Sequence, residues 1–374
     1  MTKIDYRFKI LYALGMIMVV CGHALGGGIS IMNDWFPYAG LHLAIFAFSS
    51  GYFYKSFSEE HIGKYIIKKI KDLIIPLYIY TFVYGIIVQI LKVFGFKIGG
   101  DFTLNNLLIM PIMNGHQFIY NMGGWFVVPL FMVETYNILI RKFFKIFKIN
   151  ISEVTFFVIN FLLGLSGNQL ACMGYTDNWW LVLVRMLYFV PFYGLGVFYH
   201  STLEKYDRKV PGEGYFIIIF AAKLVISCIY GEMPGYTPSW CNDFSEGPLM
   251  PIIMAYLGIA FYLRIVTILE PVIGRNRYIN LIADNTYSIM MNQFLGFMIV
   301  KMCYGLLNKY TALFSEFDWM AFKTDIWWFY MPKGLSHTLI LYVIAGIFFP
   351  ISIQMTINKL KVMYRININK KSIC

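Results

Sequence analysis

The chain has 374 residues, of which 59% are hydrophobic and 14% are charged, and its formal net charge is +11. Soluble domains carry roughly 25% charged residues, so the composition excludes an ordinary soluble protein and indicates a multi-pass membrane protein. The basic residues stand in short blocks between apolar stretches, a pattern that sets membrane topology and argues against nucleic acid as a partner. The six cysteines lack metal-ligand spacing, so no metal site is predicted.

The apolar stretches predict an all-α integral membrane bundle of about ten transmembrane helices, because each crossing needs about 20 residues and helices satisfy their own backbone hydrogen bonds in lipid. Basic blocks follow every second stretch, so the positive-inside rule predicts that both termini are cytoplasmic. No separate soluble domain is apparent, and residues 1–374 are interpreted as a single domain. The expected spans are about 10–25, 39–56, 73–94, 125–140, 151–170, 180–199, 214–230, 248–268, 280–304 and 335–357.

Two histidines bracket the link between the first two spans. The first span ends on His23, which at about 1.5 Å per residue lies about 20 Å from the cytoplasmic end. His42 opens the second span at a similar outer depth, which allows both rings to face one pocket. Ionisable groups are costly within apolar spans, so the pair suggests chemistry in a membrane-embedded pocket. The alternatives are a hydrogen bond from His23 to a neighbouring helix and an interfacial position for His42.

Several segments together resemble one family of membrane enzymes. Gly15-Met-Ile-Met-Val-Val-Cys-Gly-His23, followed by His42-Leu-Ala-Ile-Phe-Ala-Phe-Ser-Ser-Gly-Tyr-Phe53, resembles the opening of the acyltransferase-3 family. These are ten-helix integral membrane enzymes that acylate extracytoplasmic glycans and related acceptors. Further similar segments are Lys68-Lys-Ile-Lys-Asp-Leu-Ile-Ile-Pro76, Gly124-Trp-Phe-Val-Val-Pro-Leu-Phe131 and Asp284-Asn-Thr-Tyr-Ser-Ile-Met-Met-Asn-Gln293. The resemblance covers about residues 10–305.

Two positions depart from the family pattern. Tyr12 stands where the family usually has an arginine, and Asn292 stands where the late helix usually has a histidine. The resemblance implies that His23 is the base that takes a proton from the acceptor hydroxyl, since histidine suits that role at neutral pH. His42 is expected either to orient His23 or to contact the acceptor.

Cations are expected to bind the phosphates of an acyl-CoA donor. A basic cytoplasmic loop in this interpretation contains Lys64, Lys68, Lys69 and Lys71, and clustered cations attract phosphate. The alternatives are topology alone or binding of anionic lipid. Arg185 and Arg264 lie within spans and are further candidates, because guanidinium groups bind phosphate in a fork. Long cations near the end of a span also extend to water without binding a ligand.

Tryptophans suggest where a sugar would bind. Trp125 lies near the polar outer mouth and is a candidate for stacking on a sugar ring of the acceptor. The alternative is an interfacial aromatic belt, which is the preferred interpretation of the pairs Trp179-Trp180 and Trp327-Trp328.

The sequence therefore predicts a membrane O-acyltransferase of the bacterial cytoplasmic membrane. Its expected partners are acyl-CoA, with acetyl-CoA favoured as co-substrate, a polysaccharide sugar as acceptor, and membrane lipids. One rival is a transporter or flippase for a glycan precursor or small anion, which predicts internal repeats and broken helix pairs that the sequence does not contain. A sensor or scaffold without chemistry is the third hypothesis.

Overall fold

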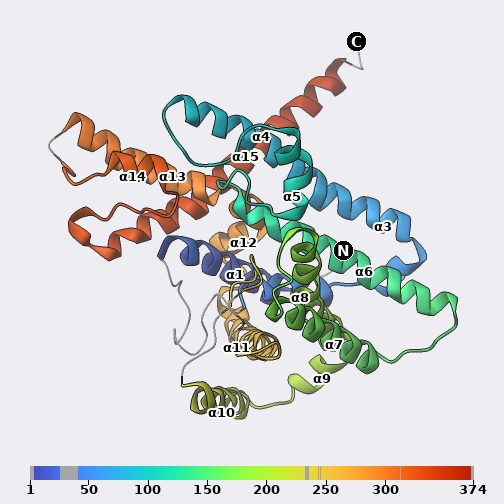
Figure 1. The fold of residues 1–374 in the computed structure, drawn as a ribbon. Coiled ribbons are helices and arrows are strands. Elements are labelled where there is room, and N and C mark those ends of the chain that lie inside the picture. Colours follow the sequence, from blue (N-terminus) through green and yellow to red (C-terminus); the bar gives the residue numbers. More distant parts are fainter. Residues whose placement is uncertain are drawn as a thin grey trace.

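The computed structural model describes residues 4–25, 41–231, 236–242, 244, 246–311 and 313–371. The chain is 78% helical, and its described residues form no strand, which confirms the predicted all-α class (Figure 1). Within the described ranges, nine helices are long and apolar enough to cross a membrane. They contain α1 (Tyr6–Leu25), α4 (Ile75–Val93), α6 (Val127–Ile146), α7 (Glu153–Cys172), α8 (Asn178–Phe198), α10 (Gly212–Tyr230), α11 (Met250–Ile273), α13 (Thr286–Tyr310) and α15 (Ile340–Lys371).

Short helices connect or extend these spans. Residues 104–113, which the sequence left as re-entrant or interfacial, form a π-helical turn and one helical turn. The short elements are α2 (Ala44–Tyr52), η2 (Ser56–Glu60), α3 (Ile62–Lys69), η3 (Ile70–Ile74), η4 (Asn105–Ile109), α5 (Met110–Met113), η5 (Met122–Phe126), η6 (Tyr199–Leu203), α9 (Glu204–Asp207), α12 (Arg277–Asp284), α14 (Trp319–Thr324), η7 (Pro332–Gly334) and η8 (Ser336–Leu339).

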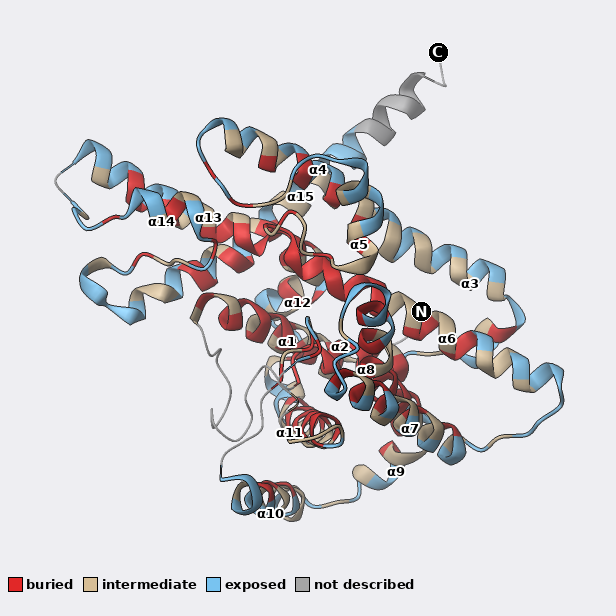
Figure 2. Ribbon diagram, viewed as in Figure 1, coloured by how far each residue is buried: buried red, intermediate tan, exposed pale blue. Residues whose placement is uncertain are grey.

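The second predicted span is shorter than expected. Instead of a helix over 39–56, α2 has nine residues, which is about 14 Å of helix and too little to cross a bilayer. It lies in the centre of the protein, where Figure 2 shows it buried, and it contacts α1, α6, α8 and α11. Protein rather than lipid surrounds α2, so its length does not have to match the hydrocarbon thickness.

Glycines let α2 approach α8 at backbone distance. A Cβ atom on Gly51 would lie 2.0 Å from the carbonyl oxygen of Tyr193, and one on Gly196 would lie 2.0 Å from that of Phe48. The hydrophobic effect does not drive helices together in lipid. Small residues at such crossings stabilise the contact instead, because they allow dense van der Waals packing. The pair Gly51 and Gly196 therefore fixes α2 in the bundle.

The predicted basic loop is helical. The helices α3, η3 and α4 run without interruption from Ile62 to Val93, so Lys68, Lys69 and Lys71 lie on a helix. Pro76, in the first turn of α4, lacks an N–H and lies two residues after the end of the π-helical turn η3, a local adjustment that lets the helix continue. Lys68 and Lys71 are exposed, whereas Lys69 is half-buried.

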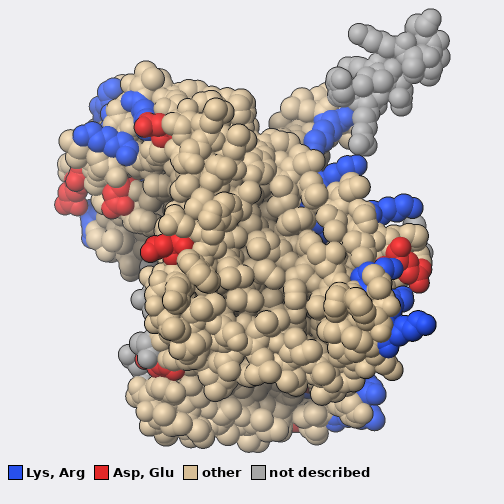
Figure 3. All heavy atoms as spheres, turned by 45° about the vertical axis from the view of Figure 1, so that its right-hand side comes forward, with Lys and Arg blue, Asp and Glu red and all other residues tan. Residues whose placement is uncertain are grey.

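Charge divides the surface as a membrane protein requires. On the face in Figure 3, charged side chains gather toward two opposite edges, and a broad, almost uncharged belt separates them. Lysines and arginines dominate one edge, whereas the other carries both signs. The belt fits a hydrocarbon layer, in which exposed charge is costly. Both cytoplasmic termini remain a prediction from the basic blocks.

Candidate functional site

A cavity of about 820 Å³ lies between α1, α2, α6 and α13, and loops form much of its wall at one end. Tyr12, Met16, Val19 and His23 line it from α1. Their spacing of four, three and four residues places them on one face of a helix, and the stripe is about 16 Å long. We call the end near Tyr12 the inner end and the end near His23 the outer end.

His23 lies near the carboxyl end of α1, where Gln293 of α13 holds its ring. His23 Nδ1 is 3.0 Å from Gln293 Oε1, and Gln293 Nε2 donates to the Met290 carbonyl oxygen at 3.3 Å. An amide oxygen only accepts hydrogen bonds, so Nδ1 carries the ring proton and Nε2 is left with the lone pair. This tautomer is the one in which Nε2 can take a proton from a substrate.

Two aromatic rings pack beside His23. The ring of Phe294 lies 5.2 Å from that of His23, and the ring of Trp327 lies 5.8 Å away, centroid to centroid. Trp327 lines the cavity, a role that the interfacial interpretation of the Trp327-Trp328 pair did not include. Lys301 is buried and donates to the carbonyl oxygen of Ile326 at 2.8 Å, so a buried cation anchors the loop that carries Trp327.

His42 lines the same cavity, as the sequence suggested, but its depth differs from the prediction. A Cβ on Gly15 would lie 3.6 Å from the His42 carbonyl oxygen, and Gly15 is eight residues, or about 12 Å, from His23 along α1. The short α2 is the physical reason, because a helix that does not cross the bilayer can begin at mid-depth. His42 therefore lies between the two ends of the cavity rather than beside its outer mouth.

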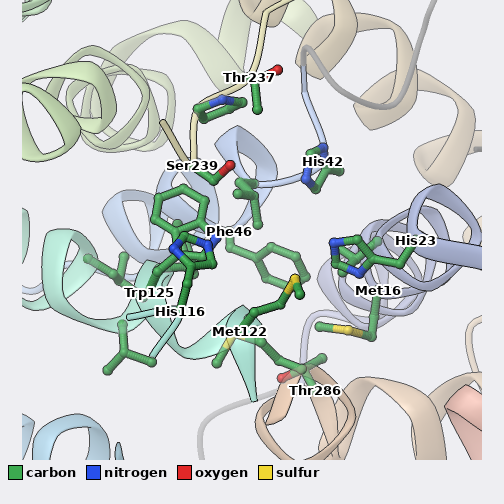
Figure 4. Close-up of a pocket in the computed structure, with 18 of the residues that line it drawn as sticks. Met16, His23, His42, Phe46, His116, Met122, Trp125, Thr237, Ser239 and Thr286 are labelled. Carbon is green, nitrogen blue, oxygen red and sulfur yellow. The ribbon is translucent and has the colours of Figure 1, made fainter. Parts of the chain in front are cut away.

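A third histidine, which the sequence analysis missed, lines the outer end. In Figure 4, His116 and His23 approach the cavity from opposite sides. His116 lies in the loop before η5, and its ring stacks on Trp240, with centroids 4.6 Å apart and an interplanar angle of 18°. Burial and the charge of Arg185 lower the pKa of His116 to about 3, so its ring is neutral at physiological pH. The available signal was the polar run from Asn114 to Gln117 directly after an apolar stretch too short to cross.

Arg185 and Trp125 belong to one buried cluster behind the outer end. The Arg185 side chain is 1% exposed, and its guanidinium carbon lies 4.8 Å from the Trp125 ring centroid. Nη1 donates to the Asn114 carbonyl oxygen at 3.0 Å, and Nε donates to that of Ser239 at 2.9 Å. Trp125 lines the cavity, and its stacking on a sugar ring stays a prediction. The contacts of Arg185 hold backbone and favour a positioning role over phosphate binding.

A charged cluster borders the inner end. Lys69 Nζ lies 2.6 Å from Oε1 of the buried Glu134, and the Ser50 hydroxyl donates to the same oxygen. Ser50 lines the cavity beside Tyr12, so the ion pair lies directly behind the inner wall. Arg264 is separate from this site: it pairs with Asp207 at 3.0 Å, and its guanidinium carbon lies 4.0 Å from the Tyr215 ring centroid.

The two departures from the family pattern have different positions. Tyr12 lines the inner end of the cavity and stacks near Phe46, with centroids 5.6 Å apart. Asn292 is buried away from the cavity wall, where Tyr84 donates to its Oδ1 at 2.8 Å and its Nδ2 donates to the Ser288 carbonyl oxygen at 2.9 Å. Asn292 therefore joins neighbouring helices, whereas Tyr12 shapes the site itself.

The apolar spans, and a mainly apolar cavity among them that contains a few polar side chains, define a multi-pass membrane protein with an internal site. A family model described as an acyltransferase domain matches residues 5–355. The chain therefore belongs to the acyltransferase-3 family and is a membrane acyltransferase. Comparisons with curated proteins and with solved structures gave no match.

Proposed function

We propose that the protein transfers an acyl group, favouring acetyl, from acyl-CoA to a hydroxyl of an extracytoplasmic or exported polysaccharide sugar, in the bacterial cytoplasmic membrane. The observation that carries this proposal is His23, whose Nδ1 is held by Gln293 and whose Nε2 keeps its lone pair at the cavity wall. A neutral imidazole in this tautomer is the base that ester formation from a hydroxyl requires. The donor enters at the inner end and the acceptor at the outer end.

The length of the cavity supports this arrangement. The α1 stripe from Tyr12 to His23 is about 16 Å long. The pantetheine arm of CoA has about twelve bonds between its phosphate oxygen and its sulfur, as many as four extended residues, or roughly 14 Å. A phosphate near the inner end therefore places the thioester near His23. Lys68 and Lys71 are exposed near this end and bind phosphate in this proposal, while Lys69 stays paired with Glu134.

The reaction balances without a redox partner. His23 Nε2 takes the proton of the acceptor hydroxyl while the oxygen attacks the thioester carbonyl carbon. The tetrahedral intermediate collapses, the carbon–sulfur bond breaks, and the imidazolium returns the proton to the sulfur, so the products are the ester and free CoA. His42, at mid-depth, lies beside the path of the thioester and orients the reacting groups in this proposal.

The test uses purified full-length protein in nanodiscs with radiolabelled acetyl-CoA and polysaccharide extracted from the bacterial envelope. We expect His23→Ala to lower kcat for label transfer by a factor of about 10² to 10⁴, the usual contribution of a general base. His61→Ala is the matched control, because His61 is exposed and remote from the cavity. If neither protein consumes any of several acyl-CoA donors, the proposal is wrong, and transport of a glycan precursor becomes the hypothesis to measure.

A further inference from the structure

Two loops that are distant in sequence meet at the outer end of the cavity. One contains His116 and the other contains Ser239 and Trp240, and all three residues line the cavity. The stacked pair of His116 and Trp240 joins these loops through side chains. Trp240 is still 43% exposed, so the pair leaves aromatic surface uncovered at the mouth of an acyltransferase site.

Arg185 joins the same two loops through their backbones. Its fork donates to the carbonyl oxygens of Asn114, two residues before His116, and of Ser239, directly before Trp240. Among the described residues, none of the ion pairs includes Arg185, although its side chain is almost fully buried. Burying a cation without a carboxylate is costly, and a planar fork is suited to holding two fixed acceptors. The contacts make Arg185 the element that sets the distance between the loops.

The hydrogen bonds of His116 define which ring nitrogen faces a ligand. Asn114 Oδ1 accepts the backbone N–H of His116 at 3.0 Å and lies 2.9 Å from its ring Nδ1. Nδ1 therefore carries the proton, and Nε2 is a hydrogen-bond acceptor. Because burial and Arg185 lower the pKa of His116 to about 3, the ring keeps this acceptor at every pH at which the protein would work. His116 is suited to hold a hydroxyl, whereas His23 is suited to deprotonate one.

We propose that His116, Ser239 and Trp240 form the subsite that binds a sugar ring of the acceptor, and that Arg185 is the positioning residue of that subsite. The weakly positive C–H face of the sugar packs on the negative face of the indole. A hydroxyl of the same ring donates to His116 Nε2, and a neighbouring hydroxyl is directed toward His23. The assignment rests on the proposed acyl transfer for its chemistry, but its binding geometry is independent of turnover.

The first test is binding without any donor. Protein in nanodiscs is titrated with chitotetraose, maltotetraose, mannotetraose and galactotetraose, and dissociation constants are compared for the wild type, Trp240→Ala, Trp240→Phe and His116→Ala. We expect about a tenfold weakening for each alanine variant and a smaller one for Trp240→Phe, which keeps an aromatic face. Trp179→Ala is the control, because Trp179 is 60% exposed and outside the cavity lining. The subsite would be overturned if the wild type bound none of the four tetrasaccharides, or if all variants bound them as tightly as the wild type.

The second test separates the subsite from the chemistry. With the envelope polysaccharide as acceptor, we expect Arg185→Lys to raise the KM for the acceptor about tenfold and to leave the KM for acetyl-CoA unchanged. Arg264→Lys, a substitution of another cation on a span, should change neither value. If Arg185 were only structural, the substitution would lower the fraction of active protein and therefore the apparent kcat. It would not raise the KM for the acceptor while leaving the KM for acetyl-CoA unchanged. Sugar binding without turnover contradicts the proposed function alone, whereas turnover with an unchanged acceptor KM contradicts the subsite alone.

Discussion

The two ends of the cavity are built by different means. The inner end is walled by helices, with Tyr12 on α1 and Ser50 on α2, and the glycine contact between α2 and α8 holds α2 in place. The outer end is walled in large part by loops, which depend on Arg185 and Lys301 for their position. The difference teaches that the helices give the cavity its length and depth, while buried cations give the outer mouth its shape.

The largest expected effect comes from breaking the helical end. Gly51→Ala places a methyl group 2.0 Å from the Tyr193 carbonyl oxygen, so α2 and α8 must separate. We expect a loss of about 3 kcal/mol or more, typical of severe overpacking, seen as a low yield of folded protein and a lower melting temperature in detergent. Gly63→Ala is the control, because nothing lies within 4 Å of a Cβ there. Equal yields and melting temperatures for both variants would show that the contact does not fix α2.

His23 lies at the outer end of the cavity, where Gln293 holds its ring. Gln293→Leu removes the oxygen that holds the ring proton on Nδ1, so the ring can adopt the other tautomer or rotate. Loss of such an orienting partner should lower kcat about 10- to 100-fold with a small change in the KM for the donor. Gln293→Glu keeps an oxygen at the same reach and should retain more activity than Gln293→Leu. The reverse order in steady-state assays would contradict the orienting role.

Two substitutions at the inner end distinguish a residue that binds the donor from a residue that stabilises the fold. Lys71→Ala should raise the KM for acetyl-CoA by a few-fold and leave the melting temperature unchanged, because Lys71 is exposed. Glu134→Ala should lower the free energy of unfolding by about 2 kcal/mol, because it removes a buried acceptor of Lys69 and Ser50. Thermal unfolding and donor titrations distinguish the two. A lower melting temperature for Lys71→Ala would mean that the lysine serves the fold.

A pH dependence of the outer mouth is also expected. The folded pKa of His116 is about 3, and an unfolded histidine has a pKa of about 6.5, so the unfolded state binds the extra proton between these values. Stability from the neutral ring is complete above pH 6.5 and falls with acidification, by up to about 2 kcal/mol at pH 5. Arg185 and His23 are the charged and titratable groups that face this ring. The melting temperature of His116→Gln should fall less between pH 7 and pH 5 than that of the wild type; parallel falls would refute the assignment.

The sequence predicted the fold class, because long apolar runs are a local signal, and it singled out His23, His42 and Trp125, which line the cavity and whose roles stay predictions. It did not predict the depth of His42, since burial of α2 by α8 depends on contacts between segments that are remote in sequence. His116 and Trp240 were missed for the same reason: neither loop carries a motif, and contacts between segments remote in sequence, including those of Arg185, bring them together. Gln293 lay within a recognised motif, but its partner is 270 residues away.

The shortness of α2 has a consequence for how the protein is made. A helix of nine residues offers the insertion machinery too little apolar length to be released into lipid as an independent segment. Its exposed backbone ends would be costly there until protein surrounds them. We therefore expect that α2 is buried only after α8, more than 120 residues later in the chain, has been synthesised and packs against it. His42 thus takes its place only after α1, α4, α6, α7 and α8 have been synthesised.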